Sequence, residues 1–183
     1  MEAKDKVYYT GVGSRSTPVS SLEFMEDLAE KIVKLLNGHA VLRSGGADGA
    51  DAAFERGASR GGGEMQIFLP WKGFKTKEYP YGHPSSLYGS SEDAFKIASE
   101  IHPTWDRCSE GARKLHARNV FQVLGPDLNT PSRVLVCWTE GGQDIGGTRT
   151  AIVLARSYDI PIFNLDSNMS DDEIWDGVLG CLV

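Results

Sequence analysis

The segment Ser44–Asp51, with the sequence SGGADGAD, follows a short apolar run and precedes a helical pattern. A glycine-rich turn between a buried strand and a helix is typical of parallel α/β sheets, because glycine permits positive φ and close backbone approach. The free N–H groups at the start of the next helix favour an anion. The segment therefore predicts a strand, an anion-binding loop and a helix in succession.

Strand-like and helix-like patterns alternate in the same way along the whole chain of 183 residues, without a repeat or a linker that would divide it. Strands are predicted at residues 7–13, 40–44, 65–71, 133–138 and 160–165, and helices at 20–37, 48–59, 92–101, 109–124, 148–158 and after Ser170. Ser20 with Glu23, and Ser170 with Glu173, have the spacing of capping boxes. We expect one α/β domain over residues 1–183, a doubly wound Rossmann-like parallel sheet with helices on both faces.

One stretch, at about residues 72–91, breaks this alternation with prolines, glycines and aromatic residues. A loop of this length inside a compact domain is usually functional or mobile. It could form a lid over a pocket or a contact between copies of the chain, and the sequence does not choose between the two.

Composition limits the possible partners. The formal net charge is −6, so no overall positive field attracts nucleic acid, and nucleic-acid binding is not favoured. No apolar run approaches the roughly 20 residues of a membrane helix, and the charged N-terminus does not resemble a signal peptide, so we expect a cytoplasmic protein without a membrane partner. Three unevenly spaced cysteines fit reduced, buried thiols. The four histidines share no ligand spacing, so neither a metal site nor another cofactor is expected.

Three glycine-rich segments lie where predicted strands end, at residues 11–15, 44–51 and 139–148. In a doubly wound sheet, ligands bind beyond the carboxyl ends of the strands. The candidate ligand-binding residues are Gly11, Gly13, Ser14, Arg15, Ser44, Gly45, Gly46, Ala47, Asp48, Trp71, Gly141, Gly142, Gly146, Gly147 and Thr148. Arg15 would bind phosphate, Asp48 a ribose hydroxyl, and Trp71 would stack on a base. Each also has an ordinary structural explanation: a surface ion pair, a charge at a helix start, or a core aromatic residue.

Two familiar nucleotide-binding motifs are incomplete or missing. Ser16 stands where the dinucleotide fingerprint G-x-G-x-x-G needs its third glycine, and no P-loop G-x-x-x-x-G-K-[ST] occurs. An ordinary NAD dehydrogenase and a P-loop ATPase are therefore disfavoured.

The three segments together resemble the SLOG superfamily, which includes DprA, the LOG phosphoribohydrolases and small nucleotide-binding proteins, many of them from bacteria and phages. The resemblance covers about residues 7–165. It is carried by Gly13-Ser14-Arg15, by Ser44–Asp51, and by Gly146-Gly147-Thr148 with Ala151 and Ala155 leading into Ile160-Pro161-Ile162. It implies the strand order 3-2-1-4-5, with a crevice between strands one and four.

The resemblance leaves the activity open. In LOG enzymes the third loop reads P-G-G-x-G-T-x-x-E, and its glutamate is used to break an N-glycosidic bond; Ala151 stands at that position here. Glu140, Asp144 or Asp48 could supply a substitute carboxylate, and Arg113 or Arg118 could correspond to the LOG arginine. Glu140, Asp144 and Arg118 are the candidate catalytic residues if the protein is an enzyme.

The missing glutamate favours binding over turnover. We expect a protein that binds a small-molecule nucleotide or a nucleotide-derived ligand, with ADP-ribose-type and cyclic signal nucleotides as candidates, and that acts as a sensor or a sequestering protein. The alternative is an N-glycosidase acting on nucleoside 5′-monophosphates. DprA-like binding of single-stranded DNA is the least favoured, because the basic segment at residues 107–118 is read more simply as a helix that faces solvent or one phosphate. Since SLOG relatives often pair through helices, we also expect a homo-oligomer of two or more copies.

Overall fold

The computed structural model of the chain describes residues 5–74, 87–88 and 91–183. Within these residues one parallel sheet is formed by β1 (Val7–Gly13), β2 (Ala40–Ser44), β3 (Glu64–Leu69), β4 (Leu87–Tyr88), β5 (Leu135–Trp138) and β6 (Ile162–Asn164). The strand order is β4-β3-β2-β1-β5-β6. The five predicted strands therefore occur in the predicted order 3-2-1-4-5, and the α/β fold class is confirmed.

The two-residue strand β4 is an addition to the prediction. It pairs with β3 at the edge of the sheet, inside the stretch that the sequence assigns to a loop. Most of that stretch, residues 75–86 and 89–90, lies outside the described residues. Its role as a lid or as a contact between copies therefore stays a prediction.

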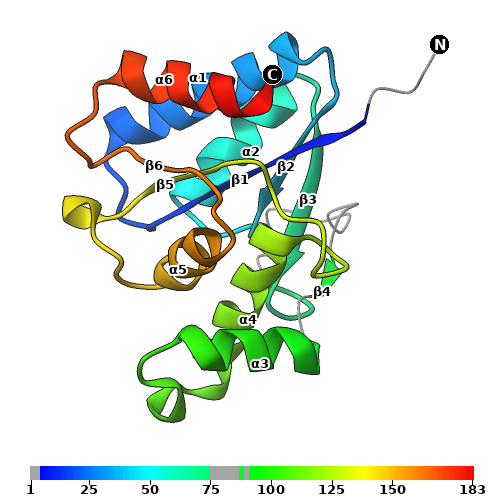
Figure 1. Cartoon of the computed structure of the whole chain (residues 1–183), viewed down its shortest axis with the longest axis vertical. Coiled ribbons are helices and arrows are strands. Elements are labelled where there is room, and N and C mark those ends of the chain that lie inside the picture. Colours follow the sequence, from blue (N-terminus) through cyan, green and yellow to red (C-terminus); the bar gives the residue numbers. More distant parts are fainter. Residues whose placement is uncertain (1–4, 75–86, 89–90) are drawn as a thin grey trace.

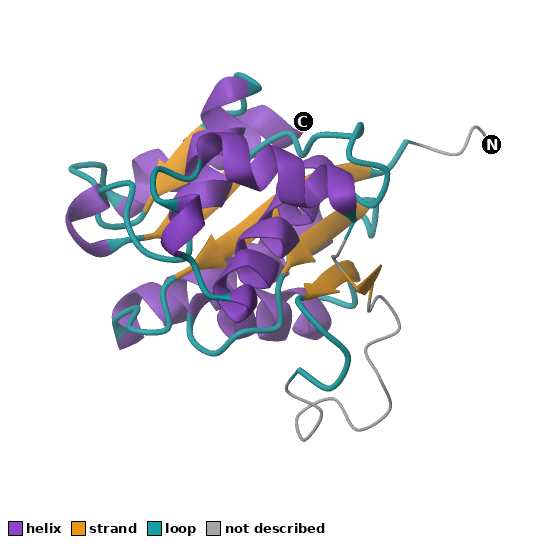
Figure 2. Cartoon of the chain, turned by 90° about the horizontal axis from the view of Figure 1, so that it is seen from below, coloured by secondary structure: helices purple, strands orange, loops and turns teal. Residues whose placement is uncertain are grey.

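Helices cover both faces of the sheet (Figure 1). One face carries α1 (Val19–Leu35), α2 (Ala50–Arg60) and α6 (Asp171–Leu182); the other carries α3 (Glu92–Ile101), α4 (Glu110–Leu124) and α5 (Arg149–Ser157). Two short 3-10 helices, η1 (Trp105–Arg107) and η2 (Glu140–Gly142), lie in connections. Figure 2 shows the molecule from below, with helices in purple and strands in orange.

Alternating side chains along the strands divide the core into two clusters. On β5, Val136 packs with the α1, α2 and α6 side, while Leu135 and Cys137 pack with the α3, α4 and α5 side. This is the period-two alternation of a strand that is buried on both faces. Both clusters contain buried strand residues, so the strands are fixed from above and below.

Helices α1 and α2 approach each other closely at Gly57. A Cβ atom there would lie 2.8 Å from the Glu26 carbonyl carbon and 2.9 Å from the Glu26 Cα, both backbone atoms of α1. The rim of this contact carries ion pairs, among them Arg60 Nε with Glu30 Oε2 at 2.6 Å. Only a residue without a side chain fits at position 57.

The two predicted capping boxes have different outcomes. At α6 the box is confirmed, because the Glu173 N–H donates to Ser170 Oγ (3.3 Å) and the Ser170 N–H donates to Glu173 Oε2 (2.7 Å). At α1 the prediction from Ser20 is wrong: the helix begins at Val19 with Pro18 as its N-cap, and no side chain caps it. Proline's fixed φ favours a helix start directly after it, so Ser20 lies inside the first turn.

Among the described residues, none of the helices has the length and the apolarity that crossing a bilayer requires.

Candidate functional site

A cleft of about 510 Å³ opens at the carboxyl ends of the strands. It lies where the neighbouring strands β1 and β5 end and their loops diverge, which is the position that the doubly wound topology predicts. Its volume lies within the range of small-molecule sites. The polar residues that line it are Ser14, Arg15, Ser16, Asp51, Arg118, Asn119, Gln122, Thr139, Glu140 and Thr148.

All three glycine segments contribute to the cleft, but only some of their residues line it. The candidates that do are Gly13, Ser14, Arg15, Ala47, Arg118, Glu140, Gly146, Gly147 and Thr148. The candidates outside its lining are Gly11, Ser44, Gly45, Gly46, Asp48, Trp71, Gly141, Gly142 and Asp144. The second segment is therefore represented by Ala47 alone among the candidates.

Several candidates outside the lining have packing or hydrogen-bonding roles beneath the cleft. A Cβ at Gly11 would lie 2.7 Å from the ring of Phe54, so this glycine lets α2 pack on β1. The Ser44 hydroxyl donates to the Gly11 carbonyl at 2.8 Å. Gly45 is closed off by Arg118, since a Cβ there would lie 2.5 Å from the guanidinium carbon. These residues shape the floor of the cleft without facing a ligand.

Asp48 is an exposed residue of the second loop, because α2 begins only at Ala50. The helix was predicted to begin at Asp48, and that start is wrong. Gly49 is the N-cap, with φ of 80°. A positive φ suits glycine and shifts the helix start past Asp48.

Asp144 and Trp71 also contact other side chains and do not line the cleft. The Asp144 carboxylate accepts hydrogen bonds from both terminal nitrogens of Arg156 on α5, at 2.5 and 3.2 Å, and this pairing lowers its pKa. Trp71 is 39% exposed and packs edge-on against Phe74, with ring centroids 5.2 Å apart. Phe74, which the sequence reading passed over, is the aromatic ring of this pair that lines the cleft.

Helix α4 supplies the floor through Arg118, which is only 5% exposed. Its guanidinium donates to the carbonyl of Gly45, to the Phe68 carbonyl (3.3 Å) and to Asn119 Oδ1 (3.1 Å). Its Nη1 lies 3.8 Å from Asp51 Oδ2. Arg118 thus connects the second glycine loop and β3 to α4 while it faces the cleft.

Asn119 makes the matching connection to the third loop. Its Nδ2 donates to the Gly147 carbonyl at 2.5 Å. The third loop leads into α5, whose N-cap Thr148 makes no side-chain cap hydrogen bond. The Thr148 side chain therefore caps no N–H group of this helix, and Thr148 lies in the cleft lining.

Gln122 is the most informative side chain of the floor. It is 1% exposed, and neither its amide oxygen nor its amide nitrogen has a hydrogen-bond partner among the residues that the structure describes. An unsatisfied buried amide costs about 1–3 kcal/mol. Because Gln122 also lines the cleft, a polar group inside the cleft can satisfy it.

Three residues of the lining that the sequence did not predict share one helical face with the candidate Arg118. Leu115, Arg118, Asn119 and Gln122 follow the spacing i, i+3, i+4, i+7, which places them side by side on α4, and all four line the cleft. The sequence contains this signal. The basic residues at positions 107–118 instead predicted a helix that faces solvent or one phosphate.

His116 also lies on α4, next to Leu115, but it does not line the cleft. Its Nδ1 lies 2.8 Å from the Thr150 hydroxyl on α5. Burial, and to a smaller extent the nearby His102, Arg118 and Arg149, together lower the pKa of His116 to about 4. The imidazole is therefore neutral at neutral pH.

Asp51 gives the cleft a pH-dependent charge. Burial raises its pKa from 3.8 to about 6, although Arg118 and the N–H groups of Ala47, Gly45 and Gly13 act in the opposite direction. Between about pH 4 and pH 6 the folded protein keeps a proton that the unfolded chain has released. The stability contributed by this group therefore falls as the pH rises through that interval, and it is constant above it.

The Asp51→Asn variant tests this. Urea unfolding of both proteins from pH 4 to pH 7 should show the parent losing stability relative to the variant as the pH rises to about 6, because asparagine does not titrate. A stability difference that stays flat across this range would contradict the raised pKa.

Comparisons with known proteins bear on the fold. No protein-family model matches the sequence, and no curated protein matches it. Among solved structures, the Moco carrier protein of Chlamydomonas rheinhardtii superposes with a TM-score of 0.56 at 16% identity, covering 98% of this chain and 99% of that protein. DNA processing protein A of Helicobacter pylori gives 0.58 at 18%, with 96% and 73% covered. The chain therefore shares its fold with these two proteins.

A third structure extends the comparison to a longer protein. DprA of Streptococcus pneumoniae gives a TM-score of 0.51 at 14% identity and covers 97% of this chain, but only 56% of DprA is matched. At these identities the likeness concerns the fold alone. The ligand has to be argued from the cleft itself.

Proposed function

We propose that this SLOG-fold protein binds a nucleotide or a nucleotide-derived small molecule in the cleft at the ends of β1 and β5, and acts as a sensor or a sequestering protein. The observation that carries the proposal is the buried, unpaired amide of Gln122, which faces a cleft of small-molecule size. Such a group is costly unless something in the cleft pairs with it.

The loops around the cleft suit a phosphate or a pyrophosphate. Gly13 and Ser14 at the end of β1 face Gly146–Thr148 at the start of α5. Backbone N–H groups and the positive end of a helix dipole stabilise an anion there. Arg15 is exposed in the cleft lining and can reach over a bound anion with its planar guanidinium.

Other residues of the cleft lining suit a base or a sugar. Phe74 and Trp138 offer ring surfaces, and Asn119 and Gln122 offer amide groups on one helical face. Amide side chains can both donate to and accept from the edge of a base. A ligand with an anionic group and a flat polar group matches this set of residues.

The carboxylates favour binding over hydrolysis. Ala151 lines the cleft, so the position of the LOG glutamate faces the ligand space without a carboxylate. Asp144 is paired with Arg156 outside the lining. Glu140 lines the cleft, and this one observation keeps the N-glycosidase as the second candidate.

The named properties of the structural neighbours agree with a ligand-binding role of some kind. One neighbour is a carrier of Moco, and the Helicobacter pylori protein is described by its mode of single-stranded DNA binding. For this chain the net charge of −6 and a concave cleft favour a small anionic molecule over a nucleic-acid strand.

Native mass spectrometry of protein purified gently from cells tests the proposal, followed by calorimetry with nucleoside mono- and diphosphates, ADP-ribose and cyclic nucleotides. Chromatography of the incubated ligands checks for turnover. An intact nucleotide retained by the protein is the expected result. Released base would overturn the binding proposal in favour of an N-glycosidase. Tight binding of single-stranded DNA without any nucleotide binding would overturn both proposals.

The Gln122→Leu variant separates a ligand role from a packing role. Leucine has a similar size without the amide, so the ligand-free variant should be as stable as the parent or about 1–3 kcal/mol more stable. Nucleotide affinity should fall about tenfold for the lost hydrogen bonds. Thermal unfolding and calorimetry measure the two effects.

Gln143→Leu is the matched control, because Gln143 is exposed on the third loop and does not line the cleft. It should leave the affinity unchanged. A Gln122→Leu protein that is less stable and binds normally would show that the amide serves the fold.

A further inference from the structure

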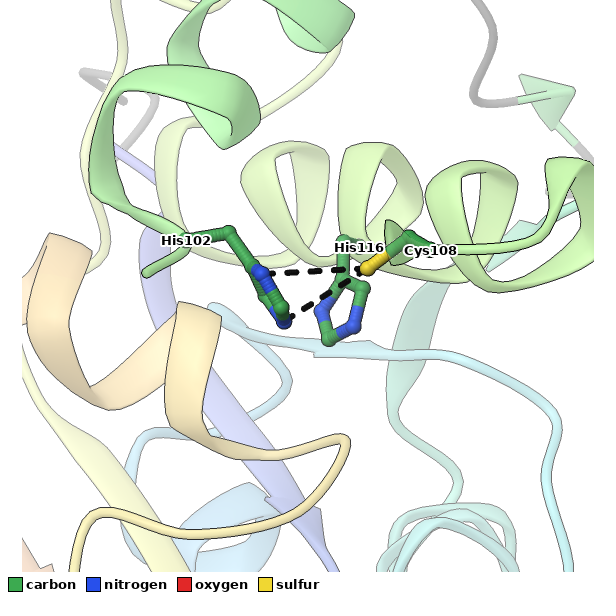
Figure 3. Close-up of side chains that lie close together, drawn as sticks. All are labelled: His102, Cys108 and His116. Atoms are coloured by element: carbon green, nitrogen blue, oxygen red, sulfur yellow. Dashed lines mark hydrogen bonds between the residues drawn. The ribbon is translucent and has the colours of Figure 1, made fainter. Parts of the chain in front are cut away.

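His102, Cys108 and His116 come together between α3 and α4, beside the cleft and outside its lining. Figure 3 shows the thiol of Cys108 close to the two imidazole rings. One ligand atom from each residue lies within 4.8 Å of the other two. His102 follows the last residue of α3, Cys108 follows η1, and His116 lies on α4.

The distances are close to those of a bound transition metal. Zinc bonds of about 2.3 Å to sulfur and about 2.0 Å to nitrogen, in tetrahedral geometry, place sulfur and nitrogen about 3.6 Å apart. Cys108 Sγ lies 3.7 Å from His102 Nδ1 and 3.9 Å from Nε2. The thiol therefore lies at nearly equal distances from both ring nitrogens, and the His102 ring would turn to aim one of them at a shared ion.

A neighbour of the cluster can hold one ligand in the form that a metal needs. Metal-binding histidines usually donate their other ring N–H to a protein acceptor, which selects the tautomer. The Thr150 hydroxyl lies 2.8 Å from His116 Nδ1. When Nδ1 donates to this hydroxyl, Nε2 keeps its lone pair.

The cysteine supplies the charge that a cation needs here. Cys108 is a free, half-buried thiol, whereas Cys137 is buried in the core. Arg118 and Arg149 act electrostatically on His116, so a cation without an anionic ligand would be disfavoured. A thiolate with two imidazoles is a donor set that suits zinc and copper.

The sequence separations of the three residues explain why the sequence does not predict this cluster. His102 and Cys108 are six residues apart and Cys108 and His116 eight, which is neither a helical i, i+4 pair nor a close pair of cysteines. The turn through η1 folds the chain back, so that the end of α3 meets α4.

We propose that His102, Cys108 and His116 form a three-ligand site for one thiolate-binding transition-metal ion, zinc or copper, with a fourth coordination position open. The ion would join the end of α3 to α4, and through Thr150 it would be linked to α5. The site is independent of the nucleotide proposed for the cleft.

Titration of reduced, chelator-treated protein tests the site, with Zn²⁺ and Cu⁺ against chromophoric competitors and with Co²⁺ as an optical probe. One equivalent of zinc or copper should bind, and the cobalt protein should show a thiolate-to-metal charge-transfer band. X-ray absorption of the zinc protein should show one sulfur at about 2.3 Å and nitrogen at about 2.0 Å. The competitor titrations identify which of the two ions binds more tightly.

The variants make the ligand assignment specific. Cys108→Ser should abolish the charge-transfer band, and Cys108→Ser and His102→Asn should each weaken binding at least about 100-fold. Both positions are only partly buried, so these variants are expected to fold, and circular dichroism checks this. Cys181→Ser and His39→Asn are the controls, because both residues lie outside the cluster, and they should bind as the parent does. Absence of stoichiometric binding, or binding that survives both cluster variants, would overturn the site.

Discussion

The Arg118→Met variant should lose about 3–5 kcal/mol of stability, which is the usual effect of removing one partner from a buried ion pair. Methionine fills much of the same space but leaves Asp51 without its cationic neighbour and the Gly45 and Phe68 carbonyls without their donor. Nucleotide affinity should fall as well, because the guanidinium faces the cleft. Urea unfolding and calorimetry measure the two losses.

Three further variants show whether the loss comes from the pair. Arg118→Lys keeps the charge without the planar fork and should lie between the parent and Arg118→Met. The double variant Asp51→Asn/Arg118→Met should be less destabilised than the sum of the single variants, because no unpaired charge remains. Arg133→Met, at an exposed arginine, should have little effect. An Arg118→Met protein as stable as the parent would contradict the described role of Arg118.

The Gly57→Ala variant should be destabilised by about 1–3 kcal/mol, the range of overpacked sites, although alanine is the better helix former. The new methyl group would meet the backbone of α1 at Glu26, and backbone cannot rotate away as a side chain can. The two helices would have to separate and strain their rim ion pairs, among them Arg60 with Glu30. Thermal or urea unfolding gives the change.

Gly111→Ala is the same substitution at an open helix position. Outside the helix's own backbone and the adjacent residues, no atom of the described residues lies within 4 Å of a Cβ at Gly111 in α4, so alanine should stabilise the protein by about 0.4–1 kcal/mol. The opposite signs at residues 57 and 111 separate helix propensity from packing. Stabilisation at both positions would show that α1 and α2 are less closely packed than described.

The strands and their order were accessible from the sequence, because short apolar runs between helical patterns have one economical arrangement. Strands β1 and β2 have the predicted bounds, β3 begins one residue earlier and ends two residues earlier than predicted, β5 begins two residues later, and β6 begins two residues later and ends one residue earlier. The glycine loops were also accessible, since their position after strands places them at one edge of the sheet. What the pattern could not show was which glycine faces a ligand and which faces a neighbouring side chain, as Gly13 and Gly11 do.

Arg118 was predicted as a candidate catalytic residue, but its burial in the floor of the cleft and the role of Gln122 were not predicted, for a physical reason. Arg118 is a charged residue in a basic segment, and such residues are rarely buried unless paired. Its partner Asp51 is 67 positions away in the sequence, and only the fold brings the two together. Gln122 is polar too, and its burial shows only when the surrounding strands and loops are in place. The predicted start of α1 was wrong for a local reason: Pro18 is the N-cap, so Ser20 lies inside the first turn.

Helix α4 is buried without interruption from His116 to Leu124. A helix on the outside of a protein usually turns one stripe toward water, and neutral substitutions accumulate along that stripe during evolution. The last nine residues of α4 have no such stripe, because the sheet, α3, α5 and the cleft surround them. Divergence among relatives of this chain should therefore be slow along this helix, and a change of ligand preference would require several of its residues to change together.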